Sequence, residues 1–159
     1  MKMEIIQEIK QKEEELENLK EKYNLEIDNE REKVLKSKLK GMKKSLYLLS
    51  FNFESSSIRT EQYLEFHRVF KRELKEVLKP YCKKIEIGKP NHFDISGFFE
   101  LNDNRIYYFS LSDLRWSKEK ILIRTVKDFK DYSGGSNGFI KLDSDFVNNL
   151  LNFLGVKIK

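Results

Sequence analysis

The chain has 159 residues, a formal net charge of +5, 36% charged residues and 39% apolar residues, with twelve Phe and seven Tyr. These values fit one globular domain with a core and an extended appendage. No apolar run reaches the roughly 18 residues of a membrane span, and charged residues from Lys2 onward exclude a secretory signal. A single Cys excludes an internal disulfide, and two His with one Cys are too few for a structural zinc site. We therefore expect a cytoplasmic protein without a membrane partner, cofactor or metal.

Residues 1–44 are predicted to form a long helical arm. The segment from Met3 to about Lys40 contains neither Pro nor Gly and is rich in helix-forming residues, and Gly41 then breaks the pattern. An imperfect coiled-coil-like seam follows a heptad frame and continues after a four-residue stutter. Its apolar positions are Ile5, Ile9, Leu16, Leu19, Tyr23, Ile27 and Val34.

The arm is strongly dipolar. Residues 1–30 carry 5 Lys against 10 acidic residues, a net −5, whereas residues 31–44 carry 7 basic residues against Glu32, a net +6. A helix with one apolar stripe either pairs with another copy or packs on its own domain. Because opposite charges align in an antiparallel pair, we predict a homodimer through this N-terminal helix.

Residues 45–159 are predicted to form an α+β domain. Its first segment, SLYLLSFNF, is predicted to be a strand, because Tyr47, Leu49, Phe51 and Phe53 alternate with polar Ser50 and Asn52. A helix capped by Thr60 and ended by Pro80 follows, with apolar positions at intervals of three and four. These positions are Tyr63, Phe66, His67, Phe70, Leu74, Val77 and Leu78.

The second half of the domain reads as a run of antiparallel strands. Strands are predicted at residues 82–87 and 121–125, with an edge strand at 139–142, and the segments FDISGFFEL and RIYYFSLSD form a hairpin around residues 102–104. Asp143 is predicted to cap a final helix that Gly155 closes. The order of elements predicts a long N-terminal helix followed by an antiparallel sheet packed on one or two helices.

A Gly-rich polar loop, KDFKDYSGGSNG, follows the strand at residues 121–125. It lacks the Gly-Lys-Ser/Thr ending of a P-loop, so it is interpreted as a turn in which Gly134 and Gly135 supply positive φ. Nearby Arg side chains need either a carboxylate, such as Asp113 or Asp128, or an external anion. The candidate binding residues are Arg115, Arg124, Lys127, Lys130, Tyr132, Ser136 and Asn137.

Catalytic readings have weaker support from the residues. Asp94, Glu100 and Asp113 lie on or beside the hairpin and would be the magnesium ligands of a small metal-dependent ribonuclease, but no acid-x-Lys signature follows them. Core positions are expected for His67 and Cys82. His92 beside Asp94 is read as a loop residue, with an acid–base pair as the alternative. In the run Tyr107–Phe109, strand alternation sends Tyr108 to one face and its neighbours to the other, which leaves room for a partial RNA-stacking platform.

Three motifs in order, SLSDLRW, LIRT and KDYSGGSN, lie in residues 45–142, and this segment resembles small accessory proteins of phages and conjugative elements of low-GC bacteria. Some of these proteins are anti-CRISPR inhibitors of RNA-guided effector nucleases. The resemblance implies a protein of the bacterial host cytoplasm that inhibits such a nuclease by binding the effector, its guide RNA or both. A coiled-coil adaptor protein of a mobile element remains an alternative. The matching positions, without assigned roles, are Ser112, Asp113, Arg115, Arg124, Thr125, Lys127, Asp131, Tyr132, Gly134, Gly135 and Asn137.

Overall fold

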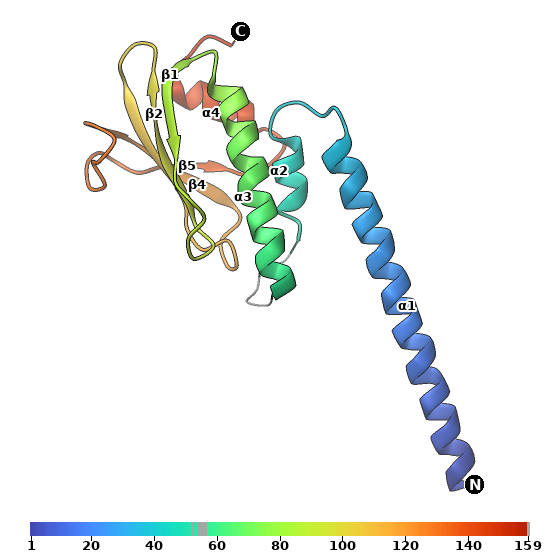
Figure 1. The fold of residues 1–159 in the computed structure, drawn as a ribbon. Helices are drawn as coiled ribbons and strands as arrows, with labels where there is room; N and C mark the ends of the chain where they lie inside the picture. Colours follow the sequence, from blue (N-terminus) through green and yellow to red (C-terminus); the bar gives the residue numbers. More distant parts are fainter. Residues whose placement is uncertain (52, 54–56, 159) are drawn as a thin grey trace. The chain divides into compact units, whose positions relative to one another are not determined.

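The computed structural model describes residues 1–51, 53 and 57–158. The chain divides into two compact units, Met1–Lys38 and Leu39–Lys159. The second unit thus begins six residues before the predicted boundary at residue 45. Within the described ranges, no helix combines the length and the apolar character needed to cross a bilayer. The architecture is α+β, with a long N-terminal helix followed by an antiparallel sheet and further helices (Figure 1).

The first unit is a single helix, α1 (Lys2–Lys36), with its C-terminal cap. It ends four residues before the predicted limit near Lys40, because Ser37 turns to an extended conformation and donates both its backbone N–H and its hydroxyl to the Val34 carbonyl. The predicted seam residues Ile5 through Tyr23 remain 51–63% exposed. The unit therefore contains no element that covers its own apolar stripe.

The predicted strand at SLYLLSFNF is wrong, since most of this segment belongs to a short helix, α2 (Lys43–Leu48), and the turn after it. Asn52 lies outside the described residues. The buried side chains are Met42, Ser45, Leu48 and Leu49, and their spacing of three and four is helical. Glu73 accepts hydrogen bonds from both the backbone N–H and the hydroxyl of Ser45, each at 2.7 Å. This buried carboxylate ties α2 to the following helix.

The next helix, α3 (Ser57–Leu78), begins three residues before Thr60, so the predicted cap lies inside its first turn. Its predicted core positions are buried, apart from half-buried Val77. Phe66 on this helix packs between Phe53 and Phe70 with tilted rings, whose centroids lie 5.6 and 5.5 Å from its own. His67 lies in the same buried face at 3% exposure, which confirms its core position.

His67 makes stability depend on pH. Burial, and secondarily the neighbouring Lys71 charge, lower the pKa of the His67 imidazole below its ordinary value near 6.5. The unfolded chain therefore binds more protons than the folded one. The contribution of His67 to the free energy of unfolding is complete above about pH 6.5 and is lost as the pH falls. We expect the melting temperature to fall between pH 7 and 5.5, and His67→Leu to remove most of that decrease. Equal pH slopes for both proteins in thermal melts would contradict this assignment.

Five antiparallel strands form one sheet in the order in which they occur along the chain. They are β1 (Cys82–Ile87), β2 (Ile95–Leu101), β3 (Ile106–Leu111), β4 (Lys120–Val126) and β5 (Gly138–Lys141). The hairpin and the strands predicted after residue 80 are thereby confirmed. The registers Phe98 to Tyr108 and Tyr108 to Arg124 place every second residue of adjacent strands on one face.

The inner face of the sheet carries the core. Phe99, Tyr107, Phe109 and Ile123 are buried there at 1–4% exposure, beneath the helices of the same unit. The last helix, α4 (Phe146–Leu154), reaches this face through Phe153, which meets the Tyr107 ring at 6.4 Å. Figure 1 shows α2, α3 and α4 on the same side of the sheet. The loop after β4 packs on the opposite, outer face through Phe129 and Tyr132.

The predicted cap of α4 needs correction, whereas its end is confirmed. The Asp143 carboxylate accepts the Asp145 N–H at 3.0 Å instead of capping the helix, which begins only at Phe146. Gly155 closes the helix with φ of 65°, a conformation that Gly adopts at low cost.

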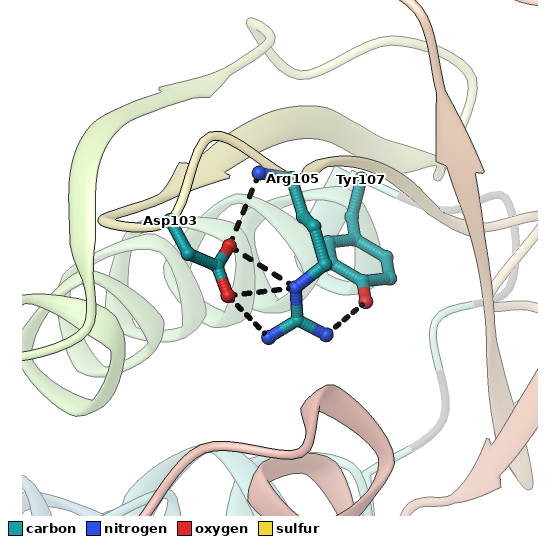
Figure 2. A network of polar contacts seen from close by, with 3 residues as sticks. All are labelled: Asp103, Arg105 and Tyr107. Atoms are coloured by element: carbon teal, nitrogen blue, oxygen red, sulfur yellow. Dashed lines mark hydrogen bonds and ion pairs between the residues drawn. The ribbon is translucent and has the colours of Figure 1, made fainter.

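The tip of the β2–β3 hairpin is held by a polar network (Figure 2). Arg105 Nε donates to both oxygens of Asp103 at 3.0 and 2.9 Å, and its Nη1 donates to the Tyr107 hydroxyl at 3.2 Å. The Arg105 side chain lowers the pKa of the Asp103 carboxyl, chiefly through these hydrogen bonds. These bonds link the turn to strand β3, so the network stabilises the hairpin.

Candidate functional site

An aromatic cluster lies on the outer face of the sheet. Phe98 on β2 packs against Tyr108 on β3, with ring centroids 5.1 Å apart, and the loop after β4 places Phe129 and Tyr132 over them. Phe129 is stacked on Phe98 at 5.6 Å, and Tyr132 stands edge-on to both Phe98 and Tyr108 at 5.3 and 6.0 Å. Phe98 becomes buried at 5% exposure, whereas Tyr132 remains 65% exposed.

Two cations lie over this cluster. The Arg124 guanidinium carbon is 4.7 Å from the centroid of Tyr108, and Lys84 Nζ is 4.5 Å from the centroid of Phe129. Arg124 also donates through Nη2 to the Tyr132 carbonyl, which joins strand β4 to the loop. The arginine Nε is buried and has no hydrogen-bond partner within the described ranges. Positive charge and exposed aromatic surface therefore coincide here.

The loop is shaped by Asp131. Its carboxylate accepts the backbone N–H groups of Lys127, Ser133 and Gly134 at 3.1, 3.2 and 2.9 Å. These bonds, led by the one from Lys127, lower the pKa of the Asp131 carboxyl. Gly135 has the predicted positive φ, 79°, whereas the same prediction for Gly134 is wrong, since its φ is not positive. Three backbone hydrogen bonds to Asp131 and the turn at Gly135 thus shape the loop that carries Tyr132.

Beside the cluster, the outer face of β3, β4 and β5 is hollowed into a groove of about 300 Å³. Lys120, at its far end, lies 4.4 Å from the centroid of Phe139, a ring that is 54% exposed. The lining includes two cations, three aromatic rings and three serine hydroxyls, but neither Asp nor Glu among the described residues. It consists of Tyr108, Ser110, Ser112, Ser117, Lys120, Leu122, Arg124, Tyr132 and Phe139.

Of the predicted binding residues, Arg124 and Tyr132 meet at this groove. Lys127, Lys130, Ser136 and Asn137 are exposed on the same loop but do not line it. Arg115 has a structural setting instead: its Nε and Nη2 each donate to the Asp113 carboxylate at 2.8 Å, and its guanidinium covers Phe93 at 4.9 Å. This is the carboxylate partner that the sequence offered as one alternative.

The three candidate magnesium ligands do not form one group, because Asp94 and Asp113 are hydrogen-bonded neighbours while Glu100 is paired elsewhere. Asp94 accepts the backbone N–H of Asp113 at 2.7 Å, and Glu100 forms an ion pair with Lys83 at 3.3 Å. Among the described residues, no three His, Cys, Asp or Glu side chains gather into a group able to hold a metal ion. Burial raises the pKa of the Cys82 thiol to about 12, so this thiol is a poor nucleophile.

Several groove residues escaped sequence reasoning. Lys120, Phe139 and Ser110 are separated by as many as 29 positions, and only the strand registers bring them together, for example Leu122 opposite Phe139. The signal that could have found them is the strand alternation: Tyr108 and Ser110 occupy the polar phase of β3, opposite the buried Tyr107 and Phe109.

The chain matches no family model, no curated protein and no solved structure.

Proposed function

We propose that the protein is a non-catalytic inhibitor of an RNA-guided effector nuclease and that it acts by binding the guide RNA of that complex. The supporting observation is the outer face of the sheet, where Arg124 and Lys120 lie on aromatic rings beside the exposed Tyr132. Cations neutralise phosphates and aromatic rings stack on unpaired bases, so this composition suits single-stranded nucleic acid. The resemblance of residues 45–142 to accessory proteins of mobile elements supports a defence complex as the source of that RNA.

The net charge of the chain favours RNA over the protein channel as the point of contact. An effector nuclease holds its guide–target duplex in a positively charged channel. A protein with a net charge of +5 is repelled by such a channel and attracted to guide RNA that projects from it. Occupying that RNA would block guide loading or target binding by steric exclusion, without making or breaking a covalent bond.

A cleavage assay with a panel of RNA-guided nucleases tests the proposal. The purified protein should reduce target cleavage by at least one effector, while guide RNA run on a denaturing gel stays intact with and without Mg²⁺. Arg124→Gln should weaken inhibition, and Lys89→Gln, which removes an exposed lysine outside the groove, should not. Unchanged guide loading and cleavage across the panel would exclude inhibition, and Mg²⁺-dependent shortening of the guide would instead identify the alternative, a ribonuclease.

A coiled-coil adaptor of a mobile element is the second candidate, favoured by the uncovered seam of α1. It differs from the first in the surface that it uses. Partner binding by an adaptor would survive substitution of Lys127 and Lys130 in the loop and would be lost when the seam is made polar.

A further inference from the structure

The residues that line the groove on β3–β5 include two cations that could bind a ligand. Arg124 and Lys120 lie on the same face of β4, four residues apart, which corresponds to about 13 Å along the strand. The described lining residues include no carboxylate, although Asp131 on the adjoining loop interacts electrostatically with Arg124. Two cations separated in this way suit an extended polyanion better than a single small anion.

The aromatic rings of the groove can accept stacked partners. Tyr132 is fixed by edge-on contacts with Phe98 and Tyr108 yet stays 65% exposed, and Phe139 is 54% exposed at the other end. A ring that is already immobilised loses little entropy when a base stacks on it. Duplex bases are stacked on each other and cannot reach these rings, so the ligand must be unpaired.

Ser110, Ser112 and Ser117 also line the groove, and Ser110 pairs with Leu122, which lies between Lys120 and Arg124 on β4. Each hydroxyl can both donate and accept a hydrogen bond, as the ribose 2′-OH does. This group distinguishes RNA from DNA at a protein site. A floor with serine hydroxyls therefore favours RNA.

We propose that this groove binds an unpaired RNA segment of two or three nucleotides. Bases stack on Tyr132 and Phe139, phosphates lie at Arg124 and Lys120, and the serines contact the ribose. The inference rests on the proposed function for the source of the RNA, and it names the binding site and the form of RNA that fits there.

Fluorescence anisotropy with labelled ten-nucleotide RNAs tests the site without any effector. The full chain should bind oligouridylate or oligoadenylate at least tenfold more tightly than a ten-base-pair RNA duplex or the matching single-stranded DNA. Tyr132→Ala and Phe139→Ala should each weaken binding roughly 5- to 150-fold, the range found for one lost base–aromatic stack. Tyr132→Phe and Phe139→Tyr keep the rings and should bind within about twofold of the parent chain.

The salt dependence separates a phosphate contact from general attraction. Lys120→Gln should make the slope of log affinity against log salt shallower by about 0.7, the value for one phosphate of a single strand. Lys89→Gln is the matched control and should leave the slope unchanged, because Lys89 lies outside the groove.

Equal affinity for duplex RNA, equal affinity for DNA, or alanine variants that bind like the parent would each overturn the inference. RNA binding without nuclease inhibition would contradict only the proposed function. Nuclease inhibition without oligonucleotide binding would contradict only the inference that the groove binds RNA.

Discussion

Replacing Gly97 with alanine is expected to lower the free energy of unfolding by about 3 kcal/mol, at the upper end for overpacked cores. A Cβ on this residue would lie 2.3 Å from the Glu86 carbonyl oxygen, 2.9 Å from Cε1 of Phe109 and 3.0 Å from Cα of Ile87. Two of these atoms belong to the backbone of β1, so the clash moves the paired strand and not only a side chain. Chemical denaturation followed by circular dichroism measures the loss.

Gly88→Ala is the matched control for this substitution. Its Cβ would meet only the Ser96 carbonyl oxygen at 3.4 Å, and Gly88 does not have a positive φ. We expect a change within about 0.5 kcal/mol, as for surface substitutions generally. If both variants lose the same free energy of unfolding, the close contact between β1 and β2 at Gly97 does not explain the loss.

The second large effect concerns the N-terminal helix. The intact chain is expected to be a dimer at tens of micromolar. The double substitution Ile9→Glu and Leu16→Glu is expected to make it a monomer. Both residues lie on the seam and are 51% and 53% exposed within the single chain. Exposed ion pairs contribute only about 0.2–1 kcal/mol each and are screened by salt, so apolar burial must supply most of the association. Light scattering gives the mass directly.

Two further measurements complete this prediction. Gln11→Glu with Asn18→Glu adds the same charge off the seam and should leave the dimer intact. The dimer should weaken yet persist in high salt, since opposite charges align in the antiparallel pair while the seam is apolar. A monomeric intact chain would exclude self-association, and the stripe of α1 would then need another partner.

The strands of the fold were predictable because their side chains alternate. In β3, buried Tyr107, Phe109 and Leu111 alternate with half-buried neighbours, which is the local signature of a sheet with one covered face. The segment at α2 carries a similar alternation but forms a helix, in which Ser45 and Leu48 are buried and Ser45 donates to Glu73, 28 residues away. Two periods overlap in this short segment, and the tertiary contact, which the local pattern does not contain, accompanies the helical one.

The candidate site was predictable only in part. Arg124 and Tyr132 stand out by residue type near a Gly-rich loop, and the structure brings them into contact. The pairing of Lys120 with Phe139 depends on the register of β4 with β5, across a connection whose length does not determine register. Arg115 has the same residue type as Arg124, but the nearby Asp113 engages it.

The most direct test of the claim that the outer face of the sheet binds RNA is photochemical cross-linking of the intact protein to guide RNA, with the modified peptides mapped by mass spectrometry. The account predicts nucleotide adducts on Tyr132, Tyr108 or Phe139, and their loss when Tyr132 and Phe139 are replaced by alanine. Adducts confined to α1 or α3, or none above those of an unrelated control protein, would contradict it.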